Sequence, residues 1–250
     1  MNNNQTLEKM KEMRLHGMCR SFETMLQSGT QNDTTADQII GSLIESEWLD
    51  RVNRKTERLI KRARFRYTAS IEEIDYASQR NLDKNIILRL ADCSFIDHKQ
   101  NIIITGATGT GKSYMASALG YQACLKGYKV MYMNLSKLFS ILKASKADGS
   151  YMKELKKISS IDLLIIDDFG LQPIDNQNQL TLLDIIEDRH STKSTIITSQ
   201  IPISKWYELI EDHTIADAIL DRLIHTAHRI DLKGESMRKT KSKTITKQKN

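Results

Sequence analysis

The sequence predicts an α/β protein with a parallel sheet, preceded by a small helical domain. From residue 101 onward, short runs of β-branched residues alternate with helical patterns, which favours parallel strands joined by crossover helices. A glycine-rich loop at residues 106–113 lies between the first such strand and its helix. Upstream, residues 5–66 carry apolar side chains at helical spacing instead.

The N-terminal part of the chain is predicted to form two helices. The first spans residues 5–27, and a polar loop over residues 28–37 follows it. Thr35 and Gln38 then form a capping-box pattern that starts the second helix. This helix continues, or restarts, through residues 50–66. On its buried side we expect Ile39, Ile40, Leu43, Ile44 and Trp48.

The outer face of the second helix is strongly basic. Residues 51–66 hold eight Lys or Arg side chains against one acidic side chain. Such clustering indicates a polyanionic partner, and we expect these side chains to contact the phosphates of duplex DNA. A solvated surface and an acidic protein partner are the alternatives. The residues expected to contact DNA are Arg51, Arg54, Lys55, Arg58, Arg62 and Arg66.

The chain is predicted to divide near residue 75. Residues 1–75 are expected to form a basic helical domain for DNA binding and oligomerisation, and residues 76–235 to form the nucleotide domain. Residues 236–250 are basic and too polar to pack, so we expect a disordered tail there.

Residues 106–113 match the phosphate-binding pattern G-x-x-x-x-G-K-[ST] at every fixed position. The glycines let backbone N–H groups and the N-terminus of the next helix face the phosphates. Lys112 is expected to reach the β- and γ-phosphates, and the Ser113 hydroxyl to help hold Mg²⁺. The sequence therefore predicts that the protein binds a nucleoside triphosphate. The loop consists of Gly106, Ala107, Thr108, Gly109, Thr110, Gly111, Lys112 and Ser113.

Further strands and helices alternate after the loop. Strands are predicted at residues 101–105, 129–134, 161–169 and 194–198. Helices are predicted at residues 114–126, from Ser136 through Leu142, and at 151–158, 178–190 and 216–226.

Two carboxylates end the buried run at residues 161–169. Asp167 is expected to be the second protein partner of Mg²⁺, because the carboxyl end of this strand lies beside the phosphate loop. Adjacent strand residues point to opposite sides, so we assign Asp168 the different role of activating or orienting the attacking water. The alternative is that one of the two carboxylates caps the following loop.

Polar residues later in the chain complete the predicted site. Ser199 or Gln200, at the end of a core strand, is expected to touch the γ-phosphate or the water, and the residues alone do not choose between them. Arg222 lies on the helix at residues 216–226. It is either a surface residue paired with a neighbour such as Asp221, or an arginine that completes the site of another subunit.

Composition excludes several other classes of protein. No apolar run approaches the roughly 20 residues that a membrane helix needs. The N-terminal sequence MNNNQTLEKMKEMR lacks the apolar segment of a signal peptide, so we expect a cytoplasmic protein that does not bind membranes. Cys19, Cys93 and Cys124 are scattered and are expected to be reduced and buried.

In order along the chain, the phosphate loop, LLIIDDFG, TSQ, WYE and AILDRLIHTAHRI resemble the IstB-type ATPases encoded by insertion sequences. These are relatives of the DnaC helicase loaders within the AAA+ superfamily. The resemblance covers nearly the whole chain, from KEMRLHGM at residues 11–18 to KGESMRK at residues 233–239. It implies a sheet of order 5-1-4-3-2, a sensor at Ser199 or Gln200, Arg222 as an arginine finger acting in trans, and Arg238 as a second sensor that contacts the nucleotide.

The resemblance also implies a function. It suggests an ATP- and Mg²⁺-dependent homo-oligomer that assembles on duplex DNA and recruits or stimulates a cognate transposase. A loader or accessory factor for a replicative helicase is the main alternative, and a small-molecule kinase with an incidental basic surface is a third. Relatives mostly carry Asp-Glu where this chain has Asp167 and Asp168. The carboxylate is thus set back by about 1.5 Å, so we expect ordinary ATP binding but slow hydrolysis.

Overall fold

The chain forms two compact units, Met1–Arg58 and Leu59–Asn250. The computed structural model describes all residues except 1, 30–33, 77–80, 235 and 238–250. The sequence predicted a division near residue 75, whereas residues 59–74 here belong to the second unit. The reason is that four apolar side chains of this segment are buried in that unit's core, namely Ala63, Ala69, Ile71 and Ile74.

The first unit contains α1 (Asn3–Glu12), α2 (His16–Ser28) and most of α3 (Ala36–Ala63). The single helix predicted over residues 5–27 is two helices, because the chain turns at Arg14, whose φ of 58° is left-handed. The predicted capping box at the start of α3 is confirmed. The backbone N–H of Thr35 donates to Gln38 Oε1 (3.1 Å), and that of Gln38 donates to Thr35 Oγ1 (3.4 Å).

Most of the predicted buried side of α3 is exposed. Leu43 is buried, but Ile40, Ile44 and Trp48 are each more than half exposed. Within this unit, α2 contacts the side of α3 that carries Glu47, whose Oε2 accepts the N–H of Gly17 on α2 (2.8 Å). A carboxylate therefore satisfies a free donor at the start of α2.

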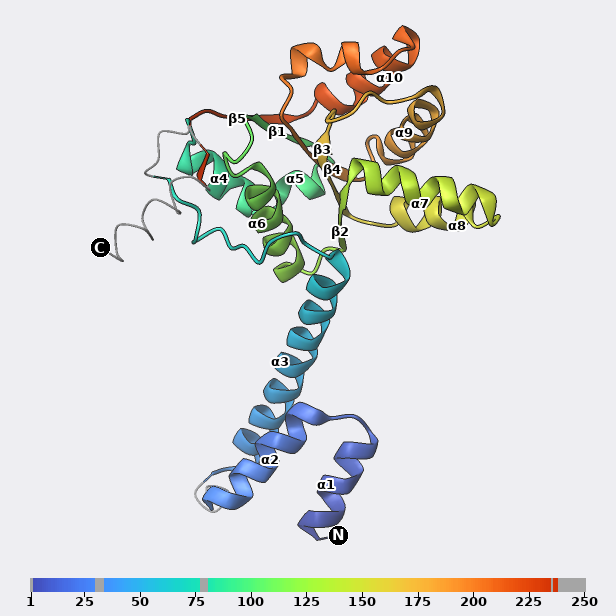
Figure 1. The fold of residues 1–250 in the computed structure, drawn as a ribbon. Helices are drawn as coiled ribbons and strands as arrows, with labels where there is room; N and C mark the ends of the chain where they lie inside the picture. The colour runs from blue at the N-terminus through green and yellow to red at the C-terminus, as the bar shows by residue number, and fades with distance from the viewer. Residues whose placement is uncertain (1, 30–33, 77–80, 235, 238–250) are drawn as a thin grey trace, which may run out of the picture. The chain divides into compact units, whose positions relative to one another are not determined.

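The second unit is built on a five-stranded parallel sheet (Figure 1). Its order, β2-β3-β4-β1-β5, is the predicted order 5-1-4-3-2 written from the other edge. Every neighbouring pair is parallel. The strands are β1 (Ile102–Gly106), β2 (Val130–Asn134), β3 (Leu163–Phe169), β4 (Ser194–Ser199) and β5 (His228–Leu232).

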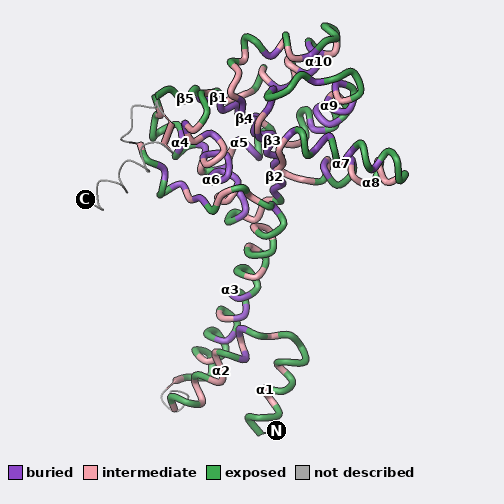
Figure 2. Tube along the Cα trace, viewed as in Figure 1, coloured by how far each residue is buried: buried purple, intermediate pink, exposed green. Residues whose placement is uncertain are grey.

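Helices cover both faces of the sheet. Side chains alternate along each strand, so that Ile102 and Ile104 enter one core while Ile103 enters the other. Figure 2 shows the resulting buried stretches along the strands and the inner sides of the helices. One core includes α4 (Lys84–Ala91), α5 (Ser94–Asp97) and α6 (Lys112–Leu125). The other includes α7 (Leu135–Ala147), α8 (Tyr151–Ser159), α9 (Asn176–Arg189) and α10 (His213–Ile224), with short 3-10 turns η2 (Ile203–Lys205) and η3 (Tyr207–Leu209).

The three cysteines are free and buried, as predicted. Burial raises the pKa of Cys93 to about 11 and that of Cys124 to about 12, which keeps both thiols protonated at neutral pH. In the described part of the chain, no helix has the length and apolar character needed to span a bilayer.

Candidate nucleotide-binding and catalytic site

The phosphate loop joins β1 to α6. Gly109 and Gly111 have φ angles of 84° and 100°, which residues with a Cβ rarely adopt, so the glycines are required for the curl of the loop. Lys112 is buried and folds back over the loop, where its Nζ donates to the carbonyls of Gly106 and Ala107 at 2.8 Å each. The ammonium group thus lies inside the loop that is expected to hold the phosphates.

Asp167 ends the regular part of β3 beside this loop. Its side chain is 1% exposed and accepts a hydrogen bond from Ser113 Oγ at 2.8 Å. Burial alone would raise the pKa of Asp167, but hydrogen bonds from the hydroxyls of Thr198, Tyr132 and Ser113 more than reverse this effect, and the pKa lies below its usual value. Asp167 and Ser113 thus offer a carboxylate oxygen and a hydroxyl oxygen side by side. Mg²⁺ takes oxygen ligands of this kind together with oxygens from nucleotide phosphates and water.

Asp168 does not point away from Asp167 as the strand pattern predicted. The pairing of β3 with β4 shifts register between Ile166 and Phe169, and Asp168 has a left-handed φ of 60°. This bulge breaks the alternation of side chains, because an extra residue on one strand turns the following side chain back. The Asp168 carboxylate accepts a hydrogen bond from Asn134 Nδ2 at 2.8 Å.

Arg66 lies between the two carboxylates. Its Nη1 is 3.2 Å from Asp167 Oδ2 and 3.3 Å from Asp168 Oδ2. The sequence assigned Arg66 to the DNA-contacting face, but α3 has already ended at Ala63, and the chain turns at Arg64, whose φ is 56°. The structure therefore places Arg66 at the nucleotide site.

The other five predicted DNA contacts lie on α3. Arg51 is paired with Glu47, and Arg54 with Glu47 and Asp50, two acidic residues that lie just before the basic segment 51–66. Within the described part of the chain, no ion pair is formed by Lys55, Arg58 or Arg62, and all three are exposed.

Three residues that contact the two carboxylates were missed by the sequence reasoning, one of which is Thr198 on β4, whose hydroxyl donates to Asp167. Asn134 ends β2 and pairs in register with Asp167, so the predicted strand order contains enough information to place it there. Tyr132, two residues earlier on β2, donates its hydroxyl to Asp167. Burial raises the pKa of Tyr132, so this phenol remains a hydrogen-bond donor at neutral pH.

The structure places the Ser199 and Gln200 side chains in different surroundings. Ser199 is buried, and its hydroxyl donates to the Phe169 carbonyl (2.7 Å) and accepts the N–H of Ile201 (3.0 Å). Gln200 is only half-buried, and its Oε1 accepts a hydrogen bond from Thr108 of the phosphate loop at 2.6 Å. Gln200 is thus the side chain that faces the nucleotide site, and Ser199 joins two strand ends.

On the expectation that this site hydrolyses ATP with Gln200 beside the γ-phosphate, Gln200→Leu should reduce the hydrolysis rate by about tenfold to a hundredfold. ATP affinity should change little, because such a polar group acts mainly in the transition state. Single-turnover hydrolysis alongside equilibrium ATP binding measures the two effects separately. Ser199→Ala is the matched control and should leave the hydrolysis rate within a fewfold of wild type. The opposite ranking would make Ser199 the sensor.

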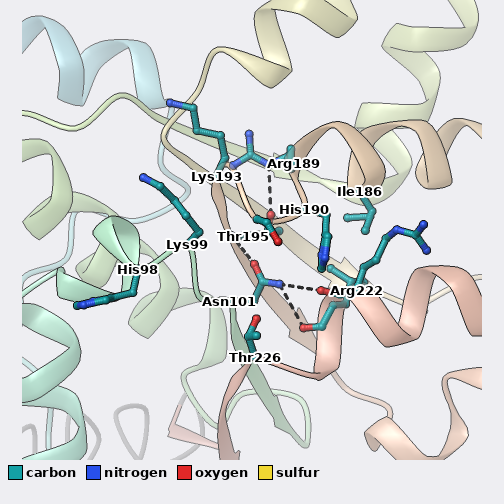
Figure 3. Close-up of a pocket in the computed structure, with 12 residues that line it drawn as sticks. His98, Lys99, Asn101, Ile186, Arg189, His190, Lys193, Thr195, Arg222 and Thr226 are labelled. Carbon is teal, nitrogen blue, oxygen red and sulfur yellow. Dashed lines mark hydrogen bonds between the residues drawn. The ribbon is translucent and has the colours of Figure 1, made fainter.

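Arg222 lines a cavity together with Asn101 and Thr195, which lie at the starts of β1 and β4 (Figure 3), whereas the phosphate loop follows the other end of β1. The cavity has a volume of about 140 Å³ and is also lined by Lys99, His190 and Lys193, and none of the described residues that line it is acidic. Arg222 Nη2 pairs with Glu187 at 3.2 Å, rather than with Asp221. The Asn101 side chain donates to the backbone carbonyl of Arg222 (3.3 Å) and holds the end of α10 at the start of β1.

Arg238, the predicted second sensor, and most of the predicted tail lie outside the described residues. The segment just before it contacts the phosphate loop, since the N–H of Met237 donates to the carbonyl of Gly109 at 2.9 Å.

Comparison with known proteins finds relatives along nearly the whole chain. A family model described as IstB-like ATP binding protein matches residues 8–245. An insertion sequence ATP-binding protein from Sinorhizobium fredii is 42% identical over 234 residues, covering 94% of this chain and 96% of that protein. Among solved structures, that of DnaI (TM-score 0.57, 20% identity) covers 71% of this chain and 94% of the DnaI chain. AMPPCP-bound DnaA from Aquifex aeolicus (TM-score 0.58, 19% identity) covers 74% of this chain and 56% of the DnaA chain. These structural likenesses concern the fold alone and agree with the predicted α/β fold.

Proposed function

Because this chain belongs to the IstB-like ATP binding protein family, we propose that it is an ATPase that assembles on duplex DNA and recruits or stimulates the transposase of an insertion sequence. The observation that carries the ATPase part is the contact between Ser113 on the phosphate loop and the buried Asp167 on β3 (2.8 Å). The insertion-sequence part rests on the relatives, which cover nearly the whole chain.

Each residue of the site has a distinct task in this proposal. The loop backbone and Lys112 hold the triphosphate, while Ser113 and Asp167 hold Mg²⁺, which supplies charge stabilisation at the β- and γ-phosphates. Asp168 orients the attacking water, and Gln200 contacts the γ-phosphate or that water. We expect slow hydrolysis, because Asp168 is one methylene shorter than glutamate and its carboxylate is already held by Asn134 and Arg66 on a bulged strand.

Arg222 is proposed to act on the nucleotide of a second subunit. It lies near the starts of β1 and β4, whereas its own phosphate loop follows the carboxyl end of β1, so it is remote from its own nucleotide site. Its cationic surroundings suit the phosphates of a neighbouring subunit's ATP. In the ion pair between Arg222 and Glu187, the Glu187 side chain is exposed, so the pair is weak. Arg222 can therefore leave Glu187 and bind a phosphate instead.

Duplex DNA is proposed to contact the exposed cations of α3. Lys55, Arg58 and Arg62 can each neutralise a phosphate without first breaking an ion pair to a described residue. Arg51 and Arg54 contribute less, because Glu47 and Asp50 already compensate part of their charge. Contacts of this kind are independent of sequence and strongly salt-dependent.

The proposal is tested by duplex DNA binding with ATP, with ADP and without nucleotide. Both the affinity and the size of the complex are measured, for wild type, for Arg222→Ala and for the double variant Lys55→Ala/Arg58→Ala. We expect ATP to produce a large assembly on DNA that Arg222→Ala prevents. Lys55→Ala/Arg58→Ala should weaken DNA binding and reduce the slope of log affinity against log salt by about two. Arg51→Ala is the matched control, with a smaller change in that slope.

Other outcomes point elsewhere. If duplex DNA does not bind under any condition, α3 is not a DNA surface and a helicase-loader function becomes the better proposal. If the assembly forms but survives Arg222→Ala, the oligomer is real and the finger lies at another residue.

A further inference from the structure

Arg66 offsets part of the negative charge of two carboxylates that lie together at the candidate nucleotide site. A single guanidinium nitrogen contacts Oδ2 of both Asp167 and Asp168, at 3.2 and 3.3 Å. Two neighbouring carboxylates repel each other, and Asp167 is almost fully buried, so a positive charge between them is strongly favourable. The structure thus holds a cation of its own against Asp167, which is expected to bind Mg²⁺, and against Asp168, which is expected to orient the attacking water.

The backbone that carries Arg66 is fixed. The neighbouring Phe65 packs on α6 at Gly120, where an added Cβ would lie 2.6 Å from the Phe65 ring, and meets Tyr132 edge-on with ring centroids 6.5 Å apart. The Arg66 side chain itself is 45% exposed. It can therefore leave the carboxylates by rotating toward solvent, without disturbing the packing of the segment.

Besides its contacts with the two carboxylates, the Arg66 side chain makes a contact with an aromatic ring. The Arg66 guanidinium carbon lies 5.7 Å from the centre of the Tyr67 ring, within the range of a cation–π interaction. Tyr67 in turn lies against Tyr114 on α6, with ring centroids 6.2 Å apart. A guanidinium that gives up the carboxylates can keep this aromatic contact.

We propose that Arg66 is a built-in counter-ion of Asp167 and Asp168 that competes with Mg²⁺, so that it sets the Mg²⁺ concentration at which the site binds ATP productively. This inference rests on the proposed nucleotide function and adds a positioning residue to it. Arg66 pairs with the carboxylates when Mg²⁺ is scarce and leaves them when Mg²⁺ and ATP bind. In each condition a cation thereby offsets part of the negative charge of the two carboxylates.

The test is ATP binding by calorimetry on the full chain at graded free Mg²⁺, with a parallel titration in EDTA. Because a half-exposed ion pair is weak, Arg66→Ala should lower the Mg²⁺ concentration for half-maximal binding by about fivefold. Arg66→Lys keeps a cation and should lie close to wild type. Lys143→Ala removes a positive charge from an exposed position on α7 and should leave the Mg²⁺ requirement unchanged.

A second measurement needs no nucleotide. Without Arg66 the two carboxylates are uncompensated, so Mg²⁺ alone should raise the melting temperature of Arg66→Ala more than that of wild type. An unchanged or higher Mg²⁺ requirement in Arg66→Ala would overturn the inference. So would weaker ATP binding in EDTA, which would make Arg66 a phosphate contact. If wild type binds no ATP, the proposed function fails, and the melting measurement alone decides the role of Arg66.

Discussion

Replacing Asp167 with asparagine should reduce Mg²⁺-dependent ATP hydrolysis by at least about a hundredfold. Asp167 contacts the phosphate-loop hydroxyl of Ser113 and is also held by donors from two neighbouring strands, Tyr132 on β2 and Thr198 on β4. An amide at this position removes the negative charge and presents an N–H₂ group to one of these donors. The site then loses affinity for the cation and its pre-organised geometry together.

Phosphate release at saturating ATP measures this effect, with ATP binding in EDTA as the companion measurement. Binding without Mg²⁺ should change little, because the loop and Lys112 hold the phosphates. Asp162→Asn is the control: it removes a carboxylate near the start of β3, where Asp162 pairs with Lys193 at 2.6 Å, far along the strand from the loop. Hydrolysis within a fewfold of wild type in Asp167→Asn would remove this residue from the metal site.

The core of the site was predictable because its residues are close in sequence or lie at strand ends. The phosphate loop is a contiguous motif, and Asp167 ends an apolar run long enough to be recognised as a buried strand. The four strands predicted from their apolar runs all form. Once these strands are ordered, the carboxyl ends of β1, β3 and β4 must meet, which brings Ser113, Asp167 and Gln200 together.

Features that depend on local backbone geometry or on a distant contact were not predictable. β5 has the sequence HRIDL, in which charged residues alternate with apolar ones at the edge of the sheet, and no apolar run marks it. The sequence around Asp168 has the pattern of a regular strand, and nothing in it indicates the bulge. Arg66 looked like one more cation of the basic helix, because nothing in the spacing indicates that the helix ends three residues earlier.

The exposed side of α3 was mispredicted for a related reason. Helical periodicity identifies which residues share a face, but it does not say whether another element covers that face. In the first unit, only the side that carries Leu43 and Glu47 meets α2. The periodic pattern of Ile40, Ile44 and Trp48 was correct, and the assumption that it marks a core was wrong.

Trp206 should be the most costly core residue to remove. It is fully buried, its ring centroid lies 4.5 Å from that of Phe169, and its Nε1 donates to the carbonyl of Ile201 at 2.9 Å. Trp206→Ala leaves a large cavity and an unsatisfied carbonyl, so we expect a loss of about 3–5 kcal/mol in the free energy of unfolding. Trp206→Phe keeps most of the volume and should lose less.

The position of Trp206 also connects the fold to the site. Phe169 directly follows Asp168, and Ile201 directly follows Gln200, so one indole ring contacts the ends of both strands that carry these proposed catalytic groups. Urea unfolding measures the stability, and Trp48→Ala is the matched control, since the chain's other tryptophan is 57% exposed and should change stability by about 0.5 kcal/mol or less. Trp206→Phe separates the two roles. Because Trp206→Phe stays folded, a loss of hydrolysis in this variant reports displaced strand ends. An equal loss of hydrolysis in Trp206→Phe and Trp48→Ala would contradict the bracing.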